Sequence, residues 1–150
     1  MKIIEINCTK RAILGAKAAK AERINKFVPC VMYGGSETIH FAVSESELRP
    51  LIYSPNTYIV QVNLENAKHN AVLQEIQFHP VSDKVIHIDF RQVFEDKPLV
   101  VKVPVKLNGL AIGVKEGGKL ALIKKKVAVK GLIKDLPDVV DINVENLKIA

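Results

Sequence analysis

Residues 28–43 read Val-Pro-Cys-Val-Met-Tyr-Gly-Gly-Ser-Glu-Thr-Ile-His-Phe-Ala-Val, and this stretch decides the fold class. Val28-Pro29 ends any preceding helix, because proline lacks the amide proton that a helix interior needs. Residues 30–33 then predict a strand, Gly34-Gly35 a turn, and 38–43 the returning strand of a hairpin. Such a hairpin indicates a fold that is built mainly of β-strands.

Short strands and two short helices are predicted around this hairpin. Ile4 and Ile6 alternate with polar residues, as in a strand, and alanine and lysine dominate the region before Val28. Ser44 or Ser46 can cap a helix that starts in an acidic run. The predicted elements are strands at 2–8, 58–62, 71–78 and 85–90, a turn at 65–68, and helices at 12–25 and from 44 to about 52.

The sequence character changes at Lys97-Pro98. Beyond it, 99–105 alternates and is β-branched, a glycine-rich stretch follows, and 120–129 and 139–144 favour further strands. No helix is predicted in this part. We therefore expect an α+β fold, mainly β with short helices, in two domains: 1–95 with the helices, and an all-β domain over 96–150 that looks incomplete.

The composition favours a folded, soluble chain. It has 150 residues, of which 48% are hydrophobic and 25% charged, so it can bury a core. No apolar run reaches the roughly 18 residues of a membrane span, and the first residues lack a secretion signal. Cys8 and Cys30 stand outside any CxxC or Cys/His cluster, which fits a reducing compartment and argues against structural zinc. We expect a cytoplasmic protein that contacts no membrane.

Positive charge gathers at the two ends of the chain. The net charge is +6, made up of +5 over 1–26, −4 over 27–97 and +5 over 98–150. Lys17, Lys20 and Arg23 share one side of the first predicted helix, within an arc of about 120°. This distribution indicates localised contact with an anion such as nucleic acid, while ordinary solvated lysine remains the alternative.

His87 and Asp89 lie two residues apart in a predicted strand, so both side chains point to one face. The pair suits RNA, because imidazole can donate to a phosphate or 2′-hydroxyl and a carboxylate can accept from base amino groups. A structural reading, in which the two side chains bind each other, stays open. Metal binding is disfavoured, since His79 is the only nearby further ligand.

Other motifs carry weaker signals. Residues 113–119 match GxxxxGK, but Leu120 stands where magnesium needs serine or threonine, and we reject a phosphate-binding loop. The run 124–126 is either a basic contact or a strand edge on which lysine prevents aggregation, and we favour the edge. No catalytic motif is found, and Cys30 is expected to be a buried core residue. An enzyme would need a pocket that joins His79, His87 and Cys30.

Several segments occur in an order that is specific to one family. In the first part these are Lys20-x-x-Arg23, Val28-Pro29-x-Val31-x-Tyr33-Gly34, Gln77-x-His79-Pro80 and His87-Ile88-Asp89-Phe90. Together they resemble the bacterial large-subunit ribosomal protein twenty-five family, which includes the general stress protein Ctc. The additional β domain of its two-domain members is resembled by Val103-Pro104-Val105, Gly109-x-Ala111-x-Gly113-Val114-x-x-Gly117-Gly118 and Leu136-Pro137.

The resemblance implies a small N-terminal β-barrel with two to three helices that binds 5S rRNA at its irregular loop E stem. The implied RNA-binding positions, with Lys17 added from its place on the cationic helix, are Arg11, Lys17, Lys20, Arg23, Tyr33, Gly34, Gln74, Gln77, His87 and Asp89. Glu22 departs from a common leucine, and Phe78 from a basic residue found in some members. Two-domain members continue past Ala150, so we expect a truncated second domain.

We therefore expect a structural constituent of the large ribosomal subunit that needs no cofactor, metal or small-molecule substrate. Its partners would be 5S rRNA, neighbouring large-subunit proteins and 23S rRNA. Helix cations would bind phosphates, and Gln77, His87 and Asp89 would read a distorted RNA helix. The alternative is a β-domain protein-interaction module that contacts acidic proteins. Co-purification with ribosomes that survives high salt would argue against this alternative.

Overall fold

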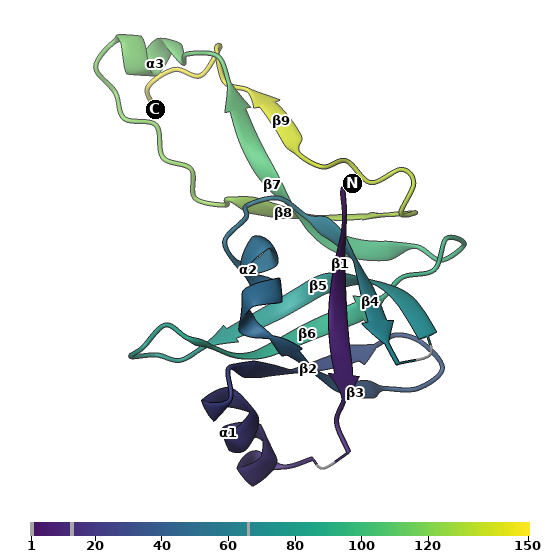
Figure 1. The fold of residues 1–150 in the computed structure, drawn as a ribbon. Coiled ribbons are helices and arrows are strands. Elements are labelled where there is room, and N and C mark those ends of the chain that lie inside the picture. Colours follow the sequence, from purple (N-terminus) through teal and green to yellow (C-terminus); the bar gives the residue numbers. More distant parts are fainter. Residues whose placement is uncertain (1, 13, 66) are drawn as a thin grey trace.

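The computed structural model describes residues 2–12, 14–65 and 67–150, and strands dominate it (Figure 1). In chain order the elements are β1 (Lys2–Lys10), α1 (Ala16–Ile24), β2 (Phe27–Tyr33), β3 (Ile39–Ser44), α2 (Glu45–Ile52), β4 (Tyr58–Leu64), β5 (Ala67–Phe78), β6 (Val85–Gln92), β7 (Leu99–Asn108), α3 (Ile112–Lys115), β8 (Lys126–Gly131) and β9 (Val140–Asn143). The predicted class, mainly β with short helices, is confirmed. Among the described residues no helix combines the length and apolarity that crossing a membrane requires.

The first six strands form a closed barrel in the order β1-β3-β2-β6-β5-β4. Parallel pairing of β1 with β4 closes it, and β2 and β6 also pair in parallel. Apolar side chains fill the interior, and the rings of Phe41 and Phe90 stack there with their centroids 5.8 Å apart. The alternate side chains of these strands therefore face outward, which is where a binding surface can form.

The hairpin predicted over 28–43 is present, since β2 pairs antiparallel with β3. β2 nevertheless begins at Phe27, so that Pro29, predicted to precede the strand, lies inside it and is fully buried. Proline is tolerated there because pairing with β6 starts only at Cys30.

The helices of the first part occur where predicted, with shorter ends. Within the predicted 12–25, α1 begins at Ala16 because Gly15 has a φ of 118°, which no helical residue adopts. α2 follows Ser44, but the Ser44 hydroxyl contacts the Ser46 hydroxyl at 2.9 Å and caps no backbone group. Residue 13 of the predicted first helix and residue 66 of the predicted turn lie outside the described residues.

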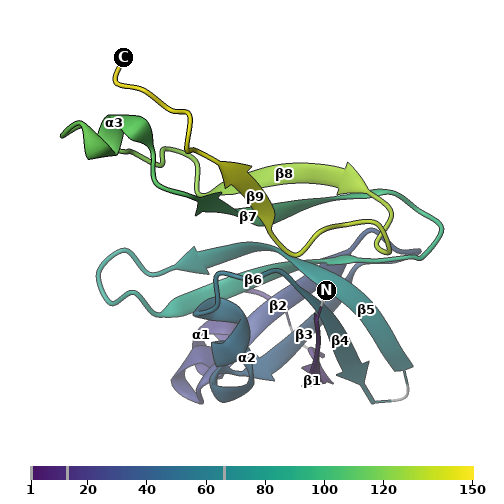
Figure 2. The same cartoon turned by 90° about the horizontal axis from the view of Figure 1, so that it is seen from above.

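β7, β8 and β9 form a second sheet in the order β8-β7-β9, which lies against β5 of the barrel (Figure 2). Val72 of β5 and Val93, just past β6, pack with Leu99, Val101 and Leu136 in a small second core. The Oγ1 atom of Thr57 adds a hydrogen bond to the Lys102 carbonyl oxygen at 2.8 Å.

Two predictions for this second part were wrong in detail. The segment contains α3, a single helical turn, although no helix was expected; buried Gly113 passes so close to the Ile149 backbone that a Cβ would lie 2.9 Å from the Ile149 nitrogen. The strand expected over 120–129 starts only at Lys126. Its ladder with β7 runs from Leu99 opposite Gly131 to Pro104 opposite Lys126. The backbone N–H of Val105 donates one further hydrogen bond to the Lys125 carbonyl oxygen, at 3.0 Å.

Candidate nucleic-acid interface

α1 lies beside β2 on the outside of the barrel, and its last turn reaches β6 (Figure 1). The Nε atom of Arg23 donates a hydrogen bond to the carbonyl oxygen of Ile86, at 3.0 Å. Ile86 directly precedes His87 in β6. The cationic end of the helix and the strand that carries His87 therefore lie next to each other.

A hollow of about 400 Å³ opens between the end of α1, the start of β2 and the β5–β6 turn. Glu45 is the acid that lines it, and its basic lining residues are Lys20, Arg23, Lys26, His79 and Lys84. The Nδ1 atom of His79 accepts the backbone N–H groups of Val81 and Ser82, each at 3.2 Å. The proton of the neutral ring therefore sits on Nε2, where it can be donated to an anion.

Next to this hollow, β5 and β6 present a polar face. Gln77 pairs with His87 and Glu75 with Asp89 across the two strands. The Nδ1 atom of His87 lies 2.7 Å from Oδ1 of Asp89, with 28% and 25% of the two side chains exposed. This contact agrees with the structural interpretation, in which the two side chains bind each other. His87 Nδ1 is itself buried and has no hydrogen-bond partner among the described residues, so a ligand can meet only the part of the two side chains that stays exposed.

Tyr33 and Gly34 border this face at the end of β2. Burial, followed by the negative charge of Asp89, raises the pKa of Tyr33, so its hydroxyl stays a hydrogen-bond donor at neutral pH. Gly34 has a φ of 93°, and a Cβ there would lie 3.3 Å from the Arg91 side chain. Glycine thus lets the chain turn sharply beside Tyr33.

Arg11 is the predicted RNA-binding cation that the structure encloses. Its Nε atom lies 3.0 Å from both carboxylate oxygens of Glu22, and only 7% of its side chain is exposed. An ion pair with this little exposure is unsuited to reaching a phosphate. The pair instead connects the end of β1 to α1, and it explains locally why an acid stands at position 22.

Gln74 lies apart from the other predicted residues. It falls in an irregularity of β5, where the register with β6 shifts between Leu73 and Glu75. Its side chain lines a separate small hollow together with Thr57, Lys102 and Lys126, at the junction with the second sheet. The structure therefore does not bring Gln74 to His87.

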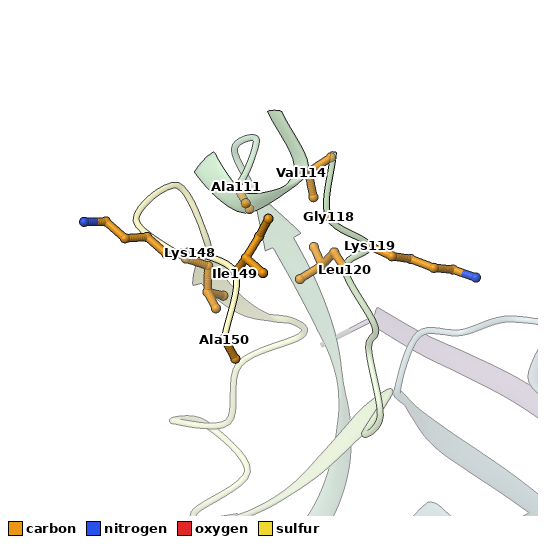
Figure 3. Close-up of a pocket in the computed structure, with 10 residues that line it drawn as sticks. Ala111, Val114, Gly118, Lys119, Leu120, Lys148, Ile149 and Ala150 are labelled. Atoms are coloured by element: carbon orange, nitrogen blue, oxygen red, sulfur yellow. The ribbon is translucent and has the colours of Figure 1, made fainter. Parts of the chain in front are cut away.

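The described residues do not form the pocket joining His79, His87 and Cys30 that an enzyme was expected to need. Cys30 is fully buried inside the barrel, whereas His87 faces outward from the adjacent strand. Within the described ranges no cluster of three or more histidine, cysteine or acidic side chains could hold a metal ion. A hollow of about 220 Å³ near the last residues is apolar, and the amino groups of Lys119 and Lys148 point away from it (Figure 3).

Two family models together match almost the whole chain. The model of the ribosomal L25p family matches residues 6–90, which is the barrel that carries the polar face. The model of the C-terminal domain of ribosomal protein TL5 matches residues 98–150. The chain belongs to the ribosomal L25p family. It is accordingly a ribosomal protein and not an enzyme.

Three relatives of this L25p-family chain align with it over nearly its whole length. All three of the following are named large ribosomal subunit protein bL25. The protein of Azobacteroides pseudotrichonymphae is 46% identical over 100% of this chain and 80% of its own length. Those of Bacteroides thetaiotaomicron and Porphyromonas gingivalis are 47% and 48% identical, over 98% and 100% of this chain and 78% and 79% of theirs.

In this L25p-family chain, sequence reasoning missed part of the cationic surface. Lys26 and Lys84 line the hollow beside Arg23 but stand outside the predicted helix and strands. Arg91, which pairs with Tyr33, was available from the strand alternation, because it follows Asp89 by two residues. Glu75, opposite Asp89, is a negative charge within the face that the sequence analysis did not weigh.

Proposed function

We propose that this chain is a structural constituent of the large ribosomal subunit that binds 5S rRNA at the loop E stem. Residues 1–95 form the RNA-binding domain in this proposal, and 96–150 are an additional domain. Family membership and the names of the bL25 relatives support the subunit. The resemblance of the N-terminal motifs supports the RNA partner.

One observation carries the proposal. The hydrogen bond from Arg23 to the Ile86 carbonyl joins the cationic hollow to the polar strand face. A ligand that lies across both would meet the cations first and then Gln77, His87 and Asp89. This order of groups suits a nucleic-acid helix, whose charged backbone borders the base edges in its groove.

The cations supply affinity and orientation in this mechanism. Lys17 and Lys20 are exposed on α1, and the hollow adds Lys26 and Lys84. Each phosphate they neutralise releases condensed counterions, so binding weakens as salt rises. These contacts hold the RNA in register but carry no information about its sequence.

The polar face then distinguishes one RNA site from another. A regular RNA helix hides its major-groove edges, whereas an irregular stem exposes base edges and unusual backbone geometry. Asp89 accepts hydrogen bonds from base amino groups, and the Tyr33 hydroxyl donates. Because these groups sit on strands of a closed barrel, they are held rigidly in place.

The test compares a loop E fragment of 5S rRNA with an unrelated RNA stem in salt titrations. Lys20→Ala should weaken binding to both RNAs and reduce the salt slope by about one unit, as expected for one lost phosphate contact. Lys68→Ala is the matched control, since Lys68 is exposed near the opposite end of β5. It should leave binding unchanged.

Asp89→Ala separates readout from charge. We expect it to reduce the preference for loop E over the unrelated stem without lowering the salt slope, because the removed group carries no positive charge. Equal affinity of the unaltered chain for the two RNAs would contradict the proposal. Binding to acidic large-subunit proteins without any RNA binding would favour the protein-interaction module instead.

A further inference from the structure

The second sheet presents a row of lysines on one face. Lys102 of β7 lies opposite Ala128 of β8, and Lys126 and Lys130 stand two residues to either side of Ala128. Because side chains alternate along strands, these three lysines point to the same side. All three are exposed, and Lys126 and Lys130 are about 13 Å apart along the strand. We call Lys102, Lys126 and Lys130 the lysine face.

Along the sequence of this part of the chain, positive and negative residues are separated from each other. Residues 98–134 contain nine lysines and one acid, whereas 135–150 contain four acids and one lysine. In the sheet order β8-β7-β9 (Figure 2), Lys102, Lys106, Lys126 and Lys130 lie on β7 and β8, and Asp141 lies on β9 at the other edge, opposite Lys106. The remaining charges of this part lie in the segments between and after the strands. An ordinary soluble surface intersperses the two signs, so this separation indicates that one edge meets an anion.

Protection of a sheet edge explains only part of the row. Lysines on the edge strand β8 would serve that purpose. Lys102, however, is on the central strand, and its carbonyl oxygen already accepts the Thr57 hydroxyl at 2.8 Å. The ion pairs seen between described residues, Arg11–Glu22, His87–Asp89 and Lys134–Glu95, involve no lysine of this face.

The neighbouring side chains favour RNA over a protein partner. Between the lysines the face offers Val100, Pro104 and Ala128, with no aromatic residue. The core of a protein interface is enriched in aromatic side chains and depleted of lysine. A cationic surface of this kind suits a sugar–phosphate backbone, which needs positive charge but no apolar pocket.

We propose that the lysine face is a second RNA contact, which binds the phosphate backbone of ribosomal RNA without reading its sequence. This inference rests on the proposed function. Lys102 and Lys126 line the same small hollow as Gln74 of the barrel. The second contact therefore begins where the barrel meets the sheet, and it gives residues 98–150 a share in holding the chain on RNA.

Crosslinking within the large subunit tests the contact directly. Ala128→Cys places a thiol at the centre of the lysine face, and a short photocrosslinker is attached to it at pH 7. Cys30 is buried, and burial with the nearby Glu47 raises the pKa of Cys8 to about 12, so both native thiols react poorly. Asp141→Cys, at an exposed position of β9 on the other edge of the sheet, is the matched control.

We expect crosslinks from position 128 to ribosomal RNA that are stronger than those from position 141. Crosslinks from position 128 to proteins alone would overturn the inference. Failure of both labelled chains and the unaltered chain to enter large subunits would instead contradict the proposed function.

A salt-release experiment provides the second readout. The variant with Lys102, Lys126 and Lys130 changed to Gln should leave large subunits at lower KCl than the unaltered chain. The control changes Lys2, Lys68 and Lys148 to Gln, which removes the same charge from exposed positions elsewhere. Release of both variants at the same salt concentration would overturn the inference. Preserved loop E preference in the first variant would show that the barrel interface is intact.

Discussion

At the scale of single residues, pairing with Glu22 determines that Arg11 contributes to folding and not to RNA binding. The guanidinium is almost enclosed, and its Nη2 atom has no hydrogen-bond partner among the described residues. A buried charge of this kind depends on its counter-charge. Arg11 therefore acts as a connection between β1 and α1, while the exposed lysines of α1 remain available for phosphate.

Replacing Glu22 tests this assignment. We expect Glu22→Gln to destabilise the chain by about 1–3 kcal/mol, because Arg11 then lacks a charged partner. The midpoint of urea unfolding measures the effect. In the control, Arg11→Met combined with Glu22→Leu should recover most of the loss, since an apolar pair leaves no buried charge. A midpoint unchanged in Glu22→Gln would contradict a structural role for the pair.

The thiol of Cys8 gives a prediction that depends on pH. Burial, followed by the Glu47 carboxylate, raises its pKa from 9.0 to about 12. The folded chain therefore holds this proton more tightly than the unfolded chain. The resulting contribution to stability is fully present below pH 9 and is lost as the pH rises through 12.

Alkylation kinetics with peptide mapping measure this directly. At pH 8, iodoacetamide should modify Cys8 far more slowly in the folded than in the unfolded chain, because the thiolate is the reactive form. Glu47→Gln should accelerate the reaction, since it removes a negative charge but keeps an oxygen to accept the Asn7 amide. Equal rates in Glu47→Gln and the unaltered chain would rule out the electrostatic contribution.

At the scale of elements, α1 is a helix that tertiary contacts hold in place. It has nine residues, none of them buried, and an isolated helix of this length is marginal in water. The Arg11–Glu22 pair and the Arg23–Ile86 hydrogen bond attach it to the barrel. α2, in contrast, buries Leu48 and Leu51.

Hydrogen exchange should reveal this difference. Backbone amides of α1 are expected to exchange faster than those of α2 in the free chain, because few contacts resist local opening. Addition of the loop E fragment should slow exchange in α1 and leave α2 unchanged. Equal protection of the two helices without RNA would show that α1 is held more firmly than its contacts indicate.

At the scale of the whole molecule, few side chains join the second sheet to the barrel. Val72 and Val93 are the barrel-side members of the second core. Docking through so small an apolar contact permits the sheet to open while the barrel stays folded. The position of the lysine face relative to the barrel interface depends on this contact.

Val72→Ala should therefore increase hydrogen exchange in β7, β8 and β9 while the barrel amides keep their protection. Loss of a buried valine side chain costs about 1–3 kcal/mol, which is large for a contact of this size. Val60→Ala, inside the barrel, is the matched control and should expose the barrel strands instead. Simultaneous loss of protection in both parts of Val72→Ala would mean that the chain unfolds as one unit.

Much of the molecule could be predicted because its signals are local. Alternation located the strands, and Gly34-Gly35 located the hairpin turn. The same alternation placed His87 and Asp89 on one face, where Nδ1 of His87 lies 2.7 Å from Oδ1 of Asp89. Alternation alone already places Gln74 and Gln77, which are three residues apart, on opposite faces of a regular strand. It could not give the register shift after Leu73, because that shift depends on pairing with β6. The enclosure of Arg11 also depended on a partner eleven residues away.

The amino-acid sequence by itself determined the class of the fold, the cationic helix and the family, because these depend on residue types and their spacing along the chain. Only the tertiary structure decided which charges are available to a ligand. Closure of the barrel brings α1 to β6, joins Arg11 to Glu22, and directs Gln74 toward the second sheet. Charges interact through space, so their roles follow from distances that spacing along the chain does not set.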